Sequence, residues 1–254
     1  MQRNSETRLS VPPCPSLPAV LFPRYRSCMK QNTVQREGQK NPYLNSISQG
    51  DCVSLLAQMP AESADFALTD PPYLVRYMSR DGRSIPNDDN DHWLRPAFAG
   101  LFRVLRRDSY AVSFYGWSHA DRFLAAYRSA GFSVIGHLVF AKRYASSTNF
   151  LRYRHEQAYL LAKGSPNKPA DPISDVIEWT YTGNKLHPTQ KPIPAMLKLV
   201  AAFSKPGQIV IDPFCGSGSS LVAARMLGRN FIGFDLDARY AAIAARRLFC
   251  DPLN

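Results

Sequence analysis

The stretch that most constrains the fold is an apolar strand that ends in an acid and continues through a glycine-rich turn into a helix. Residues 208–219 read Gln-Ile-Val-Ile-Asp-Pro-Phe-Cys-Gly-Ser-Gly-Ser, and a helix is predicted over residues 220–227. A second strand over residues 230–234 leads to Asp235. Such a strand–helix–strand unit builds a parallel sheet and puts an acid where nucleotide-binding folds hold ribose hydroxyls. The turn has the pattern G-x-G without a third glycine, so it matches a dinucleotide site poorly.

A second acid also follows a short apolar run. Residues 64–69 predict a buried strand that delivers Asp70 to the sheet edge where ligands bind in open α/β folds. Pro71 and Pro72 then make a rigid turn and remove two backbone donors before Tyr73. The turn offers a carboxylate, a free carbonyl and an aromatic ring, which suits a planar amino group on a heterocycle. A strand end followed by an ordinary proline turn is the alternative interpretation.

Together these two motifs resemble those of the DNA amino-methyltransferases that use S-adenosylmethionine. Residues 70–73, Asp-Pro-Pro-Tyr, resemble the catalytic motif, and residues 212–219 resemble the cofactor motif. The catalytic motif comes first, an order similar to that of the permuted beta class. Residues 49–52 resemble the Gly-Asp motif of this family, and residues 187–192, His-Pro-Thr-Gln-Lys-Pro, resemble the segment before its cofactor strand.

The resemblance implies a reaction and a set of site residues. A methyl group would pass directly from S-adenosylmethionine to N6 of an adenine flipped out of double-stranded DNA. The alternatives are an N4-cytosine enzyme, a catalytically inactive DNA-binding relative, and an RNA substrate. Relatives acting on cytosine more often carry serine at the first catalytic position, so Asp70 favours adenine. The implied catalytic residues are Asp70, Pro71, Pro72 and Tyr73. The implied cofactor contacts are Asp51, Lys191, Asp212, Phe214, Gly216, Gly218 and Asp235.

The predicted fold is α/β, a Rossmann-like doubly wound sheet of about seven strands with a circularly permuted motif order. Residues 46–254 are expected to form the catalytic domain. Residues 1–45 are rich in proline and basic residues and are predicted to be a poorly ordered arm. Further strands are expected over residues 46–50, 110–115, 132–142 and 156–162. Further helices are expected over residues 52–58, 93–106, 118–130, 193–203 and 238–248.

Two polar segments, residues 74–91 and 143–185, are the predicted DNA-recognition elements. Both carry arginines, and the second interleaves them with aromatic residues, a combination that contacts phosphates and stacks on bases. The candidate DNA contacts are Arg76, Arg80, Arg83, Arg143, Tyr144, Arg152 and Arg154. A solvated loop and a hairpin with incidental aromatics are the alternatives. Either Phe140 or Tyr144 could help to enclose the target base. Because no large recognition insertion is present, a short or relaxed target sequence is expected.

The charge balance supports a polyanionic partner. The chain has 31 Lys and Arg against 20 Asp and Glu, a formal net charge of +11. Its five cysteines include no C-x-x-C pair, so neither a disulfide framework nor a zinc site is expected, and a cytoplasmic protein fits. No apolar run is long enough for a membrane span. The expected partners are DNA and S-adenosylmethionine; a homodimer and a role in restriction-modification are left open.

Overall fold

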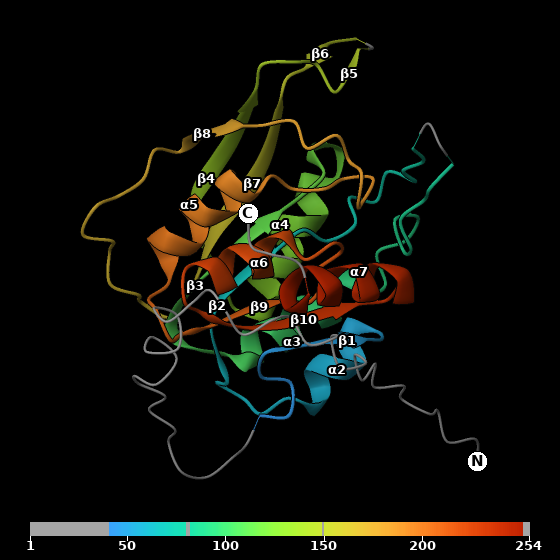
Figure 1. Cartoon of the computed structure of the whole chain (residues 1–254). Helices are drawn as coiled ribbons and strands as arrows, with labels where there is room; N and C mark the ends of the chain where they lie inside the picture. Colours follow the sequence, from blue (N-terminus) through green and yellow to red (C-terminus); the bar gives the residue numbers. More distant parts are fainter. Residues whose placement is uncertain (1–40, 80–81, 149, 251–254) are drawn as a thin grey trace, which may run out of the picture.

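One eight-stranded sheet organises the molecule (Figure 1). The computed structural model describes residues 41–79, 82–148 and 150–250, and its sheet has the strand order β1-β10-β9-β2-β3-β7-β4-β8. The strands of this sheet are β1 (Ser46–Gln49), β2 (Ala64–Thr69), β3 (Leu105–Phe114), β4 (Ser133–Lys142), β7 (His155–Lys163), β8 (Val176–Trp179), β9 (Ile209–Asp212) and β10 (Asn230–Asp235). A separate two-stranded ladder pairs β5 (Ser147–Thr148) with β6 (Arg152–Tyr153).

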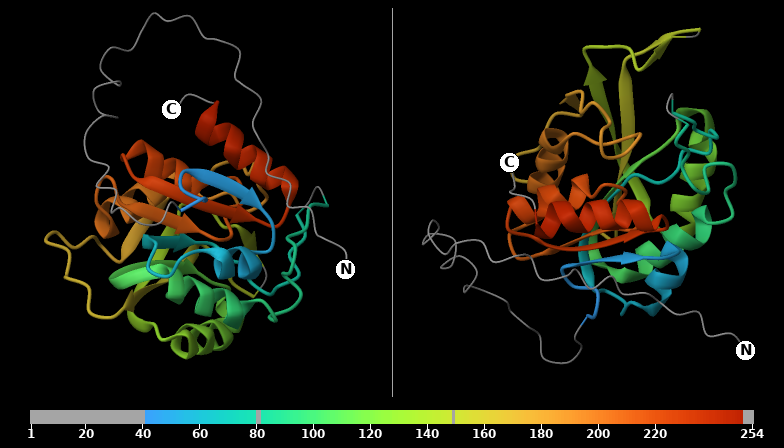
Figure 2. Two further views of the ribbon diagram at one scale, coloured as in Figure 1. Left: turned by 90° about the horizontal axis from the view of Figure 1, so that it is seen from below. Right: turned by 45° about the vertical axis from the view of Figure 1, so that its right-hand side comes forward.

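Helices cover both faces of the sheet (Figure 2). They are α2 (Cys52–Gln58), α3 (Leu94–Val104), α4 (Ala120–Ala130), α5 (Ile193–Phe203), α6 (Ser219–Met226) and α7 (Ala238–Phe249), with a short 3-10 turn η1 (Trp117–His119) before α4. Helices α2–α4 pack on one face and α5–α7 on the other, each over its own apolar cluster. Neighbouring residues of β3 show the two-sided burial: Ala111 belongs to one cluster and Val112 to the other. The predicted doubly wound α/β fold is therefore confirmed.

The strand directions explain how the site is assembled. Strands β1, β10, β9, β2 and β3 pair in parallel, so their carboxyl ends lie at one edge. Strand β7 runs antiparallel to both β3 and β4. The β4–β7 pair extends beyond the rest of the sheet, and the β5–β6 ladder projects away from the body at its tip (Figure 1). The catalytic and cofactor motifs both follow strands of the parallel part.

Two of the observed elements differ from the predicted ones. Strand β3 begins at Leu105, because α3 ends at Val104 and the chain passes directly into the sheet; the helix expected to reach residue 106 is therefore too long. Residues 176–179, within the segment predicted to be a recognition element, form β8, an eighth strand that pairs in parallel with β4. Its partner is distant in sequence, so the pairing has no local signature.

Several helix ends follow the sequence closely. Helix α5 has the predicted bounds and carries proline in its first turn, where a missing donor costs nothing. Gly131 ends α4 in the left-handed conformation, with φ 105°, as expected for a C-cap glycine. Of the predicted N-terminal arm, residues 1–40 lie outside the described residues. Within the described ranges, no helix is both long and apolar enough to cross a membrane.

Candidate active site

A cavity of about 1190 Å³ opens at the carboxyl ends of the parallel strands and contains most of the predicted site. Three acids line it side by side: Asp70 directly after β2, Asp212 at the end of β9 and Asp235 at the end of β10. The three strands are neighbours in the sheet, although Asp212 and Asp235 lie far from Asp70 in the sequence. The parallel arrangement thus brings the predicted catalytic and cofactor motifs to one site.

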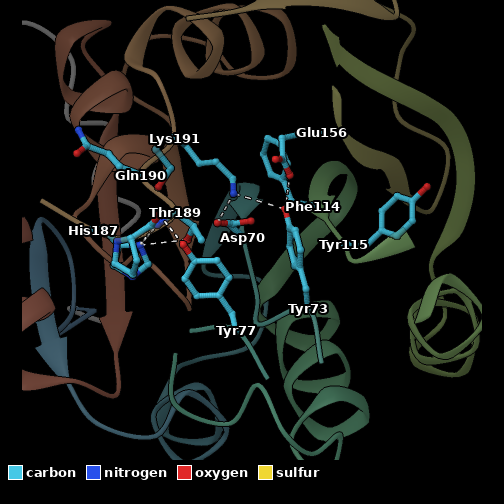
Figure 3. Close-up of polar contacts among 12 residues, drawn as sticks. Asp70, Tyr73, Tyr77, Phe114, Tyr115, Glu156, His187, Thr189, Gln190 and Lys191 are labelled. Carbon is cyan, nitrogen blue, oxygen red and sulfur yellow. Dashed lines mark hydrogen bonds and ion pairs between the residues drawn. The ribbon is translucent and has the colours of Figure 1, made fainter. Parts of the chain in front are cut away.

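Asp70 forms an ion pair with Lys191 (Figure 3). Its Oδ2 lies 2.6 Å from the Lys191 Nζ, while its Oδ1 is buried and has no hydrogen-bond donor among the described residues. Burial raises the pKa of the Asp70 carboxyl, and the charge of Lys191 is the largest influence that lowers it. The carboxylate therefore has one oxygen engaged by Lys191 and one buried oxygen whose capacity to accept a hydrogen bond is unused among the described residues.

Tyr73 stands next to this pair (Figure 3). Its hydroxyl receives a long hydrogen bond from Lys191 Nζ, 3.4 Å, and donates one to Glu156 Oε2, 3.5 Å. Burial and the nearby carboxylates raise the pKa of the phenol well above its ordinary value, so the ring stays neutral. Pro71 and Pro72 are buried and also line the cavity. All four residues of the predicted catalytic motif are thus at the cavity.

The glycine-rich turn is shaped by its two acids. Asp212 accepts hydrogen bonds from the Phe214 backbone N–H, at 3.1 Å, and from the Ser220 hydroxyl, and burial raises its pKa to about 7. Asp235 accepts the Gly216 N–H at 2.7 Å, and burial raises its pKa to about 6. Both carboxylates therefore take up a proton more readily than an exposed aspartate does.

The two glycines of the turn have different reasons to be glycine. Gly216 has φ 51° and lies under the ring of His187, which is 3.3 Å from where a Cβ would be. Gly218, the N-cap of α6, has φ 78°, and a Cβ there would come within 2.9 Å of the Ala244 side chain on α7. Gly216 keeps the cavity wall open, whereas Gly218 allows close packing of two helices and does not line the cavity.

Asp51 lies beside the main cavity. It is exposed and caps α2, accepting the Ser54 N–H at 3.1 Å. It lines a separate cavity of about 40 Å³, and Phe214 and Leu236 line both spaces. The adenine contact expected of Asp51 would therefore have to be made across this shared wall.

The predicted DNA contacts divide into two groups. Arg83, Tyr144 and Arg152 line the main cavity. Arg76, Arg143 and Arg154 are exposed and do not line it, and Arg143 pairs with Glu178 at 2.8 Å. Arg80 lies outside the described residues. Of the two aromatics considered for enclosing the base, Phe140 is fully buried in the core, so only Tyr144 is at the cavity.

The sequence interpretation missed three features of the site. Lys142 on β4 and Glu156 on β7 form an ion pair at the cavity wall, although nothing in their strands distinguished them from solvated charges. His187 packs edge-on against Tyr240, 4.3 Å between ring centroids, and burial lowers its pKa to about 3, so it is neutral. Asp88 accepts the backbone N–H groups of Leu74 and Tyr77, both at 2.6 Å, and folds the loop after the catalytic motif. In the part of the chain that the structure describes, no cluster of ligands suits a metal ion.

Comparisons with known proteins agree with this geometry. The family model described as DNA methylase matches residues 64–246. The chain is 51% identical over 205 residues, 81% of its own length and 90% of the other, to the Escherichia coli (strain K12) protein named "Putative methylase YubD".

Two solved structures share the fold at low identity. The complex of M1.HpyAVI with S-adenosylmethionine (SAM) superposes with a TM-score of 0.64 at 24% identity, covering 80% of this chain and 98% of that one. The PvuII DNA methyltransferase, described as cytosine-N4-specific, superposes with a TM-score of 0.66 at 18% identity, covering 84% and 90%.

Proposed function

The chain belongs to the DNA methylase family of N6 and N4 amino-methyltransferases, and we propose that it methylates N6 of adenine in double-stranded DNA. It is a DNA methyltransferase, and its cofactor is S-adenosyl-L-methionine. The observation that carries the adenine proposal is aspartate, and not serine, at the first catalytic position, Asp70. The motif order supports membership of the permuted beta class.

The residues present fit the cofactor. When bound, S-adenosylmethionine supplies an electrophilic methyl group on a sulfonium sulfur. Asp235 would accept the ribose hydroxyls, since a carboxylate at the end of this strand is suited to that contact. Asp51 would accept the adenine amino group. The methionine end would lie against the glycine-rich turn, where Gly216 leaves room that a side chain would fill. This turn comprises Asp212, Phe214, Gly216 and Gly218, and Lys191 is proposed to approach the carboxylate.

The catalytic motif would activate a poor nucleophile. The lone pair of an exocyclic amino group is delocalised into its ring, so the nitrogen must pyramidalise before it can attack. Asp70 and the Pro71 carbonyl would accept its two hydrogens, favour that change and stabilise the positive charge that develops on nitrogen. Tyr73 would stack on the base, which must leave the duplex because its amino group is otherwise out of reach. The remaining contribution is alignment of the two reactants.

Cytosine N4 is the second candidate. Its amino group poses the same chemical problem, and the three acceptor and stacking groups of the motif would serve it equally. The preference for adenine depends on Asp70 standing where relatives that act on cytosine more often carry serine. An inactive DNA-binding relative is less consistent with the complete set of acids, glycines and Tyr73.

The test is to incubate unmethylated DNA with the protein and labelled S-adenosylmethionine, digest it, and identify the methylated nucleoside by mass spectrometry. N6-methyladenine is expected. N4-methylcytosine would replace the proposal by the second candidate, and no methylated nucleoside would favour an inactive relative. Asp70→Ala should lower turnover by about 100- to 1,000-fold, because it removes a preorganised acceptor. It should leave cofactor binding nearly intact.

We also propose that the target sequence is short or degenerate. Each strictly read base pair needs its own side-chain contacts, worth about 1–3 kcal/mol of discrimination. Few candidates are available: among the predicted DNA contacts that the structure describes, only Arg83, Tyr144 and Arg152 line the cavity. Sequencing of methylated genomic DNA would measure the target directly. One strictly read site of about six or more base pairs would contradict the proposal.

A further inference from the structure

We infer that Lys191 is the positioning residue of the amino-group acceptor: its ammonium group holds Oδ2 of Asp70 and keeps the carboxylate in the form that only accepts hydrogen bonds. This inference rests on the proposed amino-methyl transfer, and it adds a role for Lys191 besides the expected contact with the cofactor carboxylate.

The ammonium group of Lys191 has a defined environment. Nζ lies 2.6 Å from Asp70 Oδ2 and 3.4 Å from the Tyr73 hydroxyl. Three aromatic rings surround it, with centroids at 5.0 Å for Phe114, 5.3 Å for Tyr73 and 5.8 Å for Trp179. The side chain is 9% exposed, so its charge is poorly screened by water and acts strongly on the carboxylate.

The backbone around Lys191 delivers its side chain to the catalytic carboxylate. Lys191 lies just before α5, the helix that packs on the face of the sheet opposite to α2–α4. Both Lys191 and Pro192 are buried. A turn holds the preceding segment, because the Gln190 N–H donates to the His187 carbonyl at 3.1 Å. The Gln190 side chain in turn accepts the Leu186 N–H at 3.2 Å. A buried, hydrogen-bonded backbone makes the direction of the lysine a property of the fold.

An ionised carboxylate is needed for the proposed role of Asp70. In that state both oxygens only accept hydrogen bonds, whereas a protonated carboxyl carries an O–H donor that would oppose an amino N–H. Burial favours the protonated form, and Lys191 is the main opposing charge. Removing the ammonium would therefore favour the protonated form of Asp70, which carries a donor where the proposed role needs an acceptor.

The other groups around Asp70 do not replace this charge. Those facing the pair from neighbouring elements are Glu156 of β7, Lys142 of β4, Asp212 of β9, and Tyr73 and His187 from the connecting segments. Lys142 is engaged with Glu156, and His187 is neutral because burial lowers its pKa to about 3. The two carboxylates among them favour protonation of Asp70. Among these groups Lys191 alone supplies a cation to Asp70.

The experiment compares the pH dependence of the single-turnover methylation rate in four proteins: the parent, Lys191→Met, Lys191→Arg and Lys198→Met. Lys198 is a matched control, since it is an exposed lysine on α5 and loses the same charge and the same length of side chain. Saturating DNA and S-adenosylmethionine are used, and cofactor affinity is titrated at each pH. Thermal melting establishes whether each variant is folded. If Lys191→Met does not fold, Lys191→Gln replaces it as the neutral variant.

In Lys191→Met the acid limb of the rate profile should move up by about one to three pH units, the effect of losing a neighbouring opposite charge. The rate should recover as the pH rises above this limb. Lys191→Arg should keep the parent limb, Lys198→Met should match the parent throughout, and Asp70→Asn should have no such limb.

Two outcomes would overturn the inference. One is a Lys191→Met profile that is lower at every pH but has its acid limb where the parent has it. The other is weakened cofactor binding with an unchanged profile, which would assign Lys191 to the cofactor carboxylate alone. Neither outcome affects the proposed function, which would fail only if the parent protein itself did not methylate adenine.

Discussion

Gly116→Ala is predicted to impair the catalytic motif although it replaces none of the four residues of that motif. Gly116 follows β3, directly beside the chain that leaves β2, and a Cβ added there would lie 2.6 Å from the Tyr73 carbonyl oxygen and 2.9 Å from the Tyr73 Cβ. Its own backbone angles, φ −78° and ψ 121°, are accessible to alanine. The whole effect of the substitution is therefore steric, and it falls on the backbone of Tyr73.

The size of the effect follows from these distances. Ordinary contact with a Cβ begins at about 3.4 Å, so the Tyr73 backbone must move by about 0.8 Å. A misplacement of about 1 Å in an active site can cost about 100-fold in rate. We expect a decrease of about 30- to 100-fold, which corresponds to roughly 2–3 kcal/mol in the activation free energy. Overpacking of this kind should also lower the free energy of unfolding by about 1–3 kcal/mol.

The assay is a single-turnover measurement with enzyme in excess over DNA, at a temperature where melting shows the variant to be folded. Cofactor affinity, titrated separately, should stay close to that of the parent, because the contacts proposed for it lie on other strands. Gly228→Ala is the control: it adds the same methyl group where no atom lies within 4 Å, at a positive φ of 74°. It should lose some stability and keep its rate. A Gly116→Ala rate within about threefold of the parent would refute the reasoning.

Three further predictions concern the base, the cofactor turn and DNA. Tyr73→Ala should remove about 1–3 kcal/mol of stacking on the base. The single-turnover rate should therefore fall roughly 5- to 150-fold. Tyr73→Phe loses only hydroxyl contacts of 3.4 and 3.5 Å and should be milder; equal losses would exclude a stacking role. The folded-state pKa of Asp212, about 7, lies above its ordinary 3.8, so the folded protein binds the extra proton and its stability falls as pH rises between these values. The melting temperature of Asp212→Asn should therefore equal that of the parent near pH 4 and exceed it above pH 7. A difference in melting temperature that stays constant across this range would contradict the assignment. DNA affinity should fall by orders of magnitude between roughly 50 and 200 mM salt, and Arg152→Ala should reduce the log–log slope by about 0.9 if it contacts one phosphate; an unchanged slope would remove Arg152 from the interface.

Local sequence patterns were sufficient for the elements that carry the motifs. The apolar runs before Asp70, Asp212 and Asp235 each predicted a strand ending at an acid, and all three are strands. Helix α5 has the predicted bounds, since its proline and apolar periodicity are local signals. The resemblance of the two motifs to a known family predicted the cofactor, which the comparisons support. The individual cofactor contacts, including Asp51, remain predictions.

Pairings between segments that lie far apart along the chain could not be predicted from the sequence. An exposed loop and an edge strand have similar compositions, so β8 became recognisable only through its pairing with β4. The same applies to the loop after Tyr73, which was interpreted from its arginines, although Asp88 organises it by accepting two backbone N–H groups. A single aspartate among several in a polar segment has no feature that distinguishes a buried hydrogen-bond acceptor from a solvated charge.

The sequence by itself determined which chemical groups this protein has and which strand ends present them, because strand, turn and helix signals depend on neighbouring residues. Only the tertiary structure decided how those groups meet. It brings Lys191 to Asp70 and Lys142 to Glu156, and it buries Phe140 while leaving Tyr144 at the cavity. The physical reason is that a charge interacts according to its distance and burial, and both are set by the packing of segments that lie far apart along the chain.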